Sequence, residues 1–366
     1  MASLYIHVPF CKQKCLYCNF YSQTNLSRIE DFITALKLEI ESHTETWKNE
    51  YFETLYFGGG TPSLLTPTQL EDILNFLQTH FKFSKTIEQT IEVNPETVTS
   101  NYFKELKCLG FNRLSMGVQS FDDTVLKFLG RIHNAEQAIN AVHHALNADF
   151  ENLSIDLIYG IEDLNDKLWE ESLTQVFNLK IPHLSAYALT VEEASVLAQK
   201  IKKQQLQEPD EDHILRQFKI LMNRTEQFNF EHYEISNFAL KGFRSKHNSN
   251  YWNHTPYLGL GPSAHSFFNG YRFWNTRKLF DYYQESEELS QDDLYNEMIM
   301  LKLRLIEGID LNEVEARFGL KQKLFLLQKI KILNPQHYSL IDSCLKLTNE
   351  GKCFADGIAS ALFAEK

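Results

Sequence analysis

The sequence predicts an α/β fold in two parts, a partial (β/α)6 barrel and a smaller, mainly helical, winged-helix-like C-terminal domain. Short β-type runs alternate with helical patterns six times in the first half of the chain, which is typical of a parallel sheet wrapped by helices. Six units, rather than eight, indicate an incomplete barrel. Polar and glycine residues gather just after these runs, where such barrels carry their ligand sites. In the second half the alternation stops, and short helices and one hairpin follow.

The six β-type runs are short and apolar, and glycine or Asn-Pro follows several of them. We place strands at 4–8, 54–57, 90–93, 113–118, 153–158 and 184–189. Helices are predicted at 28–43, 66–81, 99–109, 135–148, 166–177 and 209–228. In the second of these helices, Thr66 is a capping residue and Pro67 stands in the first turn, where its missing N–H is harmless. These elements define a barrel over residues 1–230.

The remainder of the chain has a different pattern. Residues 231–289 form an aromatic-rich bridging segment. We expect 231–278 to be irregular, because aromatic, Gly, Asn and His residues are mixed there without a period. The acidic run at 285–293 is expected to be a solvated linker that runs into the start of a helix. The C-terminal domain is predicted to span 290–366. Its elements are helices at 295–305, 311–318, 321–333 and 351–363 and a hairpin at 339–347.

The composition argues against several classes of function. The 366 residues are 43% hydrophobic, enough for a large core and more than one domain. The net charge of −12 argues against a nucleic-acid partner held through phosphate contacts. No apolar run long enough to span a membrane and no signal-peptide pattern occurs, and the six cysteines are too scattered for a disulfide framework. We therefore expect a cytoplasmic protein with at most peripheral membrane contact. Aromatic patches could support a homodimer.

Three cysteines near the N-terminus carry most of the functional information. Cys11, Cys15 and Cys18 are spaced C-x-x-x-C-x-x-C. Three thiolates can hold three irons of a 4Fe–4S cubane and leave the fourth iron open to a substrate or cofactor. The alternative is a zinc-stabilised barrel, in which His7 would complete the ligand set. Structural zinc usually takes paired C-x-x-C units, and the other cysteines, at 108, 344 and 353, form no second pair. The spacing therefore favours the cluster.

A glycine run follows the second predicted strand. Gly58, Gly59 and Gly60 precede Thr61-Pro62, and glycine lets the backbone adopt positive φ and come close to a ligand. Taken alone, such a run is more simply a tight strand-to-helix turn. It comes one β–α unit after the cysteines, and this position makes ligand binding the better interpretation.

Four polar residues stand at or beyond the later strands: Glu92, Gln119, Arg131 and Asp156. Each alone is more simply structural, as a turn cap, a solvated charge or a paired carboxylate. Together they would place two carboxylates, an amide and a guanidinium around one rim of the barrel. Carboxylates can bind ribose hydroxyls or an ammonium group, and arginine can bind a carboxylate with two hydrogen bonds.

These motifs jointly resemble the coproporphyrinogen III oxidase-like branch of the radical S-adenosylmethionine (SAM) superfamily. The matching blocks are 5–11, the GGGTP loop, 117–120, 130–131 and 154–157, and they cover about half the chain in the family's order. The resemblance implies that Cys11, Cys15 and Cys18 hold the cluster and that the Tyr17 backbone lies near the adenine. It implies a SAM site lined by Tyr5, Gly59, Gly60, Thr61, Glu92, Gln119, Arg131, Asp156 and Ala188.

Within this branch the sequence favours a haem chaperone over an oxygen-independent oxidase that decarboxylates coproporphyrinogen III. Phe20 occupies the position where the oxidases carry a further cysteine, and the first strand begins without their N-terminal extension. Residues 247–252 also resemble the H-N-x-x-Y-W motif that is associated with haem in the chaperones. A neutral imidazole is a common axial ligand, so His247 is the expected haem ligand, with His254 and His265 as competitors. The alternative is an aromatic loop that packs one domain onto the other.

The sequence therefore predicts a protein that binds a 4Fe–4S cluster, SAM and haem and transfers haem to an acceptor protein. The alternative function is the radical SAM oxidase itself.

Overall fold

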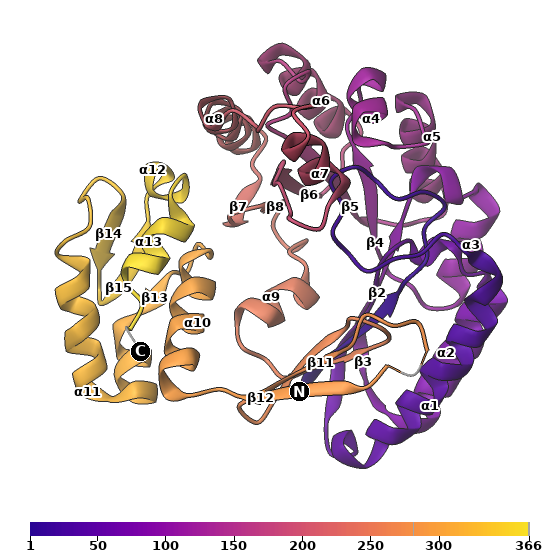
Figure 1. Ribbon diagram of the computed structural model, residues 1–366, viewed down its shortest axis with the longest axis horizontal. Coiled ribbons are helices and arrows are strands. Elements are labelled where there is room, and N and C mark those ends of the chain that lie inside the picture. Colours follow the sequence, from indigo (N-terminus) through magenta and orange to yellow (C-terminus); the bar gives the residue numbers. More distant parts are fainter. Residues whose placement is uncertain (281, 365–366) are drawn as a thin grey trace.

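One large sheet organises the molecule (Figure 1), a computed structural model that describes residues 1–280 and 282–364. Among these residues, twelve strands are ordered β12-β11-β10-β9-β1-β2-β3-β4-β5-β6-β8-β7. The six central strands are parallel and confirm the predicted partial barrel. They are β1 (Ala2–Val8), β2 (Tyr51–Gly59), β3 (Lys82–Val93), β4 (Arg113–Gln119), β5 (Asn152–Tyr159) and β6 (His183–Ala188).

Helices cover the outer face of these strands, as predicted. They are α1 (Ile29–Trp47), α2 (Pro67–His80), α3 (Ser100–Cys108), α5 (Ala135–Leu146), α6 (Asp166–Asn178) and α8 (Glu211–Gln227). Strands β1 and β4 are almost continuously buried because helices cover one face and the barrel interior lies on the other. The start of α2 follows from its sequence: Thr66 and Gln69 form a capping box, and Pro67 stands in the first turn.

Two short helices of the barrel part were not predicted, α4 (Asp123–Leu129) and α7 (Val196–Lys202). Each has seven residues, too few for a 3.6-residue period to stand out. The cap of α4 was nevertheless present in the sequence, since the Asp122 carboxylate accepts from the backbone N–H groups of Thr124 and Val125.

The prediction that residues 231–278 are irregular was wrong. This segment forms β7 (Glu231–Glu234), β8 (Asn237–Ala239), α9 (Lys246–Trp252), β9 (Tyr257–Leu260), β10 (His265–Phe268) and β11 (Tyr271–Asn275). The first part of the acidic run was wrongly expected to be a linker, because it forms β12 (Gln284–Glu288). The helix start predicted at its end is confirmed by α10 (Gln291–Leu303). These strands have three to five residues and are stabilised by pairing with the sheet edges, where β9 lies beside β1 and β8 beside β6. A strand that is stabilised mainly by its neighbours shows little β-type pattern in its own sequence.

The C-terminal part has its own small core, as expected for a winged-helix-like domain. It contains α10, α11 (Leu311–Ile330), α12 (Asn349–Lys352), α13 (Ala355–Ala361) and a three-stranded sheet. The strands of that sheet are β13 (Ile309–Asp310), β15 (Cys344–Leu347) and β14 (Tyr338–Ile341). Gly319, at φ 86°, interrupts α11, in agreement with the two helices predicted there.

Residues 304–306 join this part to the barrel. The Ile235 N–H donates to the Arg304 carbonyl (3.1 Å), and the Ile306 N–H donates to the Tyr233 carbonyl (3.1 Å). The Arg304 guanidinium also pairs with the buried Glu234 carboxylate at 2.8 Å. Within the described residues, no helix is both long and apolar enough to cross a membrane.

Candidate cofactor-binding cleft

A cleft of about 1000 Å³ opens where the six parallel strands end. Thirteen of the fourteen site residues predicted from the sequence line it. They are Tyr5, Cys11, Cys15, Tyr17, Cys18, Gly59, Gly60, Thr61, Glu92, Gln119, Arg131, Asp156 and Ala188. The cleft continues past them to α9, the β9–β11 strands and α10, so both parts of the chain contribute to its walls.

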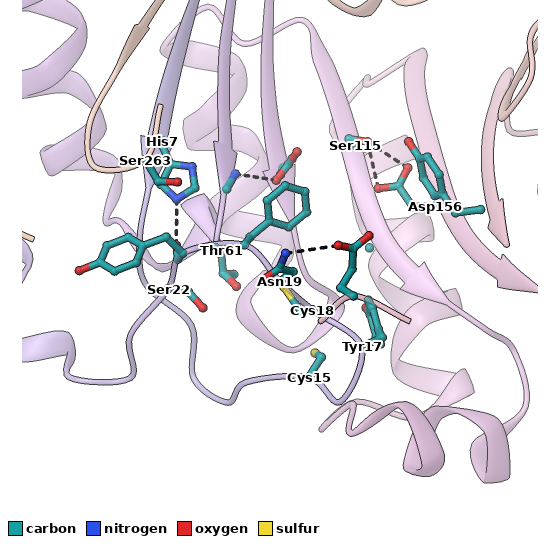
Figure 2. Close-up of a pocket in the computed structure, with 18 of the residues that line it drawn as sticks. His7, Cys15, Tyr17, Cys18, Asn19, Ser22, Thr61, Ser115, Asp156 and Ser263 are labelled. Carbon is teal, nitrogen blue, oxygen red and sulfur yellow. Dashed lines mark hydrogen bonds between the residues drawn. The ribbon is translucent and has the colours of Figure 1, made fainter. Parts of the chain in front are cut away.

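The cysteine loop connects β1 to α1 and is held at several points. At its start, the Cys11 N–H donates to the Gln23 backbone carbonyl (3.0 Å). In its middle, the Leu16 N–H donates to the Leu129 backbone carbonyl (3.0 Å). Its exit is held by the buried His7, whose Nε2 lies 2.9 Å from the Tyr21 carbonyl oxygen (Figure 2). These contacts position the loop through groups other than its thiols.

Each of the three thiols has a hydrogen-bond donor. Arg131 Nη1 donates to Cys15 Sγ at 3.5 Å, and Thr61 Oγ1 donates to Cys11 Sγ at 3.6 Å. The Phe20 backbone N–H donates to the Cys18 thiol. Burial raises the pKa of the Cys11 and Cys18 thiols, an effect that these donors oppose. Donors to sulfur stabilise the thiolate, which is the form that ligates iron.

The three thiols thus fit an iron–sulfur cluster in number and chemistry. Among the described residues, no three His, Cys, Asp or Glu side chains converge tightly enough to hold a single metal ion. A zinc site would need such a convergence, whereas the cysteines of a cubane each bind a different iron. The donor set therefore agrees better with a cluster than with zinc.

Glycine is needed in this run because neighbouring groups lie too close for a side chain, and not only to form a turn. Gly59 has φ 105°, and a Cβ there would lie 2.7 Å from the His7 ring. At Gly60, a Cβ would lie 2.5 Å from the Phe10 carbonyl oxygen, and the Gly60 N–H donates to the Val8 carbonyl at 2.9 Å. The glycine loop therefore packs directly on the start of the cysteine loop.

Glu92 and Asp156 place two carboxyl groups on the inner side of the cleft. Glu92 accepts from Tyr56 Oη (2.9 Å) and from the Gly59 N–H (3.1 Å). Asp156 accepts from Ser115 Oγ at 3.2 Å (Figure 2). Burial and the charge of Asp156 raise the pKa of Glu92 to about 8, and burial raises that of Asp156 to about 6. A cationic ligand would favour the charged form of these two carboxyl groups, so the cleft is suited to such a ligand.

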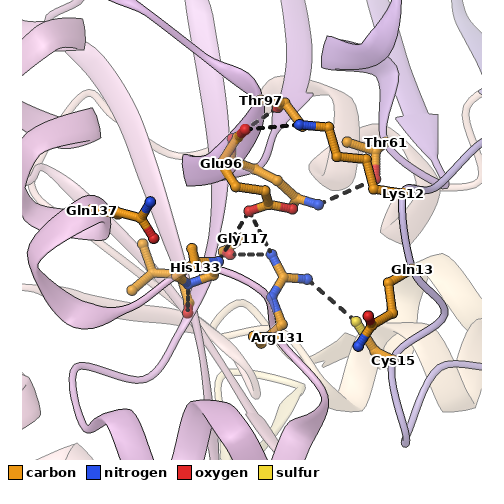
Figure 3. A network of polar contacts seen from close by, with 12 residues as sticks. Lys12, Gln13, Cys15, Thr61, Glu96, Thr97, Gly117, Arg131, His133 and Gln137 are labelled. Carbon is orange, nitrogen blue, oxygen red and sulfur yellow. Dashed lines mark hydrogen bonds and ion pairs between the residues drawn. The ribbon is translucent and has the colours of Figure 1, made fainter.

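Arg131 links this cleft to a polar network (Figure 3). Its Nη2 donates to the Gly117 carbonyl at 2.9 Å and lies 3.9 Å from the Glu96 carboxylate. His133 Nδ1 lies 3.1 Å from the same carboxylate, and Lys12 Nζ donates to the Glu96 carbonyl at 3.0 Å. Arg131 Nε is buried without a partner among the described residues. The residue as a whole lines the cleft, and a guanidinium there can bind an acceptor such as a carboxylate.

The other predicted residues also face the cleft. Gln119 ends β4 at φ 68°, a left-handed conformation that is uncommon for glutamine and often found at functional sites. Tyr5 Oη lies 3.3 Å from His7 Nδ1, and Ala188 is the last residue of β6. Tyr17 follows Cys15 in the loop and lies against the inner wall (Figure 2).

His247 is the one predicted residue that the structure does not bring to the cleft. Its side chain is buried, with Nδ1 2.8 Å from Thr54 Oγ1 and Nε2 2.9 Å from Tyr251 Oη. Its ring stacks on Tyr56 at a centroid distance of 4.8 Å. Burial, with the positive charge of Arg113, lowers the pKa of His247 to about 3, so the ring is neutral.

A second lobe of the cleft was largely missed by sequence reasoning. Aromatic, basic and sulfur-containing side chains line it, from α9, the β9–β11 strands, the following loop and α10: Tyr251, Trp252, His254, Tyr257, His265, Phe267, Arg272, Arg277 and Met300. Only the two histidines and the Tyr-Trp pair had been singled out from the sequence. Tyr257, Phe267 and Arg272 lie on strands whose pairing is not visible in the sequence, and Arg277 lies in the loop that follows them.

Family models match both parts of the chain. One described as the Radical SAM superfamily matches residues 5–176, and one described as the HemN C-terminal domain matches residues 289–354. The solved structure of Escherichia coli coproporphyrinogen III oxidase (HemN) has a similar fold, with a TM-score of 0.85 at 23% identity over 99% of this chain and 90% of that one. The fold and the cysteine loop thus define a radical SAM protein.

Curated relatives show which family of radical SAM proteins the chain belongs to. The heme chaperone HemW of Bacillus subtilis is 30% identical over the full length of both chains. That of Mycobacterium tuberculosis is 31% identical over 98% of this chain and 94% of the relative, and that of Escherichia coli is 29% identical over 99% and 98%. The chain belongs to this HemW family of radical SAM proteins.

Proposed function

We propose that this protein binds a 4Fe–4S cluster and SAM in the barrel lobe of the cleft, binds haem in the second lobe, and passes the haem to an acceptor protein. One observation carries the proposal: the three-thiol loop and the aromatic, His- and Arg-lined lobe belong to the same cleft. Its relatives of matching length are named heme chaperones.

In the barrel lobe, Cys11, Cys15 and Cys18 would hold the cluster. The cluster and SAM, when bound, would supply an electron donor and a sulfonium that can be cleaved by reduction. Arg131, which lines the cleft, would bind the SAM carboxylate, and Glu92 would bind a cationic or hydroxyl group. The chain's part is to position these groups and to keep water away, since the inner wall is buried.

The second lobe suits a flat, largely apolar molecule with acidic edges. Tyr251 and Tyr257 meet edge to face at 4.6 Å, and Tyr257 and Phe267 lie 6.4 Å apart, so aromatic surface is continuous there. Arginines at the rim can bind carboxylates. A haem presents both features, an apolar macrocycle and two propionates.

Phe20 supports the chaperone over the oxidase. It is 65% exposed, lines the cleft, and occupies the position at which the oxidases carry a further cysteine. The likeness to the solved oxidase is at 23% identity and concerns the fold alone.

The test is an anaerobic titration of the cluster-reconstituted protein with haem, followed by absorbance, and then transfer of that haem to an acceptor apoprotein. Saturable binding near one haem per chain and transfer would support the proposal. The absence of saturable binding would contradict it. Formation of 5′-deoxyadenosine and decarboxylated product from coproporphyrinogen III in the same sample would support the oxidase instead.

A further inference from the structure

His247 is poorly placed to ligate iron. An axial ligand needs a free nitrogen lone pair, and both ring nitrogens of His247 already have hydrogen-bond partners. Its side chain is 1% exposed and does not line the cleft. If the ring turned to bind iron, the buried hydroxyls of Thr54 and Tyr251 would lose their hydrogen bonds to it, which is unfavourable.

The β10–β11 hairpin presents a different histidine. Because side chains alternate along a strand, His265 and Phe267 point to one face while Ser266, between them, is buried on the other. On β11, Trp274 is opposite His265 and Arg272 is opposite Phe267, so all four side chains share this face. The His265 and Trp274 ring centroids are 6.4 Å apart.

The His265 imidazole is open to the cleft. It is exposed, and no hydrogen bond or ion pair involves its ring within the described part of the chain. Partial burial and the positive charges of Arg272 and Arg277 lower the pKa of His265, which keeps the ring neutral at physiological pH. A neutral imidazole with free nitrogens is the form that binds haem iron.

Arg277 supplies the complementary charge. It lines the cleft, and its positive charge lowers the pKa values of both His265 and His7. Arg272 is paired with Glu287 and Glu297. Among the described residues no carboxylate pairs with Arg277, and a guanidinium can bind a carboxylate of a ligand.

His254 is the competing candidate. Both its ring nitrogens are buried and have no hydrogen-bond partner in the described part of the chain, and Nε2 lies 3.7 Å from the Glu297 carboxylate. Its side chain is only 11% exposed and is enclosed by Phe267, whose ring centroid is 5.5 Å away. A macrocycle needs an open approach along the iron–nitrogen axis, which His265 offers and His254 does not.

We propose that His265 ligates the haem iron, that Arg277 binds a propionate, and that His247 is a positioning residue that holds α9 and Tyr251 against β2. This assignment rests on the proposed haem-binding function. It places the macrocycle on the hairpin face, with Phe267 beneath it and the Tyr251–Trp252 end of α9 at its edge. The haem would then lie next to the cysteine loop.

The experiment compares anaerobic ferric haem titrations of the unaltered, cluster-reconstituted protein with three single variants, followed by absorbance and electron paramagnetic resonance. His265→Ala is expected to lose the signature of histidine ligation and to bind haem at least tenfold more weakly. His254→Ala is expected to keep the spectrum of histidine ligation. Arg277→Gln is expected to keep the spectrum but to bind about tenfold more weakly, the usual effect of losing a charged hydrogen bond.

Added imidazole separates ligation from folding. In His265→Gly, imidazole in the buffer should restore the histidine-type spectrum, and iron content should show an intact cluster. An unchanged spectrum in His265→Ala, or loss of the spectrum in His254→Ala alone, would overturn the assignment. If the unaltered protein binds no haem, the proposed function fails. If it binds haem and His265→Ala binds equally well, only the ligand assignment fails.

Discussion

The raised pKa of Glu92 predicts that SAM binding strengthens as the pH rises. Glu92 is buried, and Asp156 nearby adds negative charge, so that the Glu92 pKa is about 8. A cationic ligand favours the charged carboxylate, so binding at lower pH must first remove a proton. With this pKa, roughly half of the Glu92 carboxyls are ionised at pH 8 and about 3% at pH 6.5. The apparent affinity should therefore fall about 16-fold between these values.

The assay is equilibrium binding of SAM to the cluster-reconstituted protein at pH 6.5, 7.2 and 8. The amino group of SAM titrates as well, and Glu92→Gln controls for this because only the protein group changes. The variant is expected to bind more weakly at pH 8 and to lose most of the pH dependence. Equal affinity at pH 6.5 and pH 8 in the unaltered protein, or the same slope in Glu92→Gln, would refute the reasoning.

The stability of the ligand-free protein should follow the opposite trend. The folded-state pKa of about 8 lies above the ordinary value of 4.5, so the folded protein binds the proton more tightly than the unfolded chain. This stabilising contribution is complete below about pH 4.5 and is lost as the pH rises through 8. Thermal unfolding without SAM should therefore occur at lower temperature at pH 8.5 than at pH 6, and Glu92→Gln should reduce the difference.

Three further predictions concern the cysteine loop and its supports. Cys15→Ala should remove the iron found after anaerobic reconstitution, whereas Cys108→Ala, at an exposed position on α3, should leave the iron content unchanged. Gly59→Ala should destabilise the protein by about 2–4 kcal/mol in denaturant unfolding, because it adds a clash with the His7 ring to backbone strain. The control Gly242→Ala, at φ 92° with open space around it, should lose only about 1 kcal/mol, and equal losses would exclude the clash. Arg131→Lys should retain the cluster but bind SAM about tenfold more weakly, since the lysine ammonium lacks the planar fork by which the guanidinium binds Cys15 and Gly117 and can pair with a carboxylate, and unchanged SAM affinity would contradict this role.

The sequence alone determined the barrel and the barrel lobe of its cleft. Each of the six strands carries its own apolar run, and parallel strands place their carboxyl ends at one rim. Residues as far apart as Cys11 and Asp156 therefore had to meet there. The cysteine spacing and the GGGTP loop are local features, and local features can be read from a single chain.

Only the tertiary structure decided the second lobe. The strands β9 to β12 are short and are stabilised by their neighbours, so their existence depends on the exposed edge of β1 rather than on their own residues. The same pairing turns His265 toward the cleft and leaves α9 packed on β2, where the His247 ring nitrogens are occupied by Thr54 and Tyr251. A histidine in a motif can be recognised from sequence. Whether its nitrogens are free depends on which neighbours the fold brings to it, because hydrogen bonds between distant segments are not encoded locally.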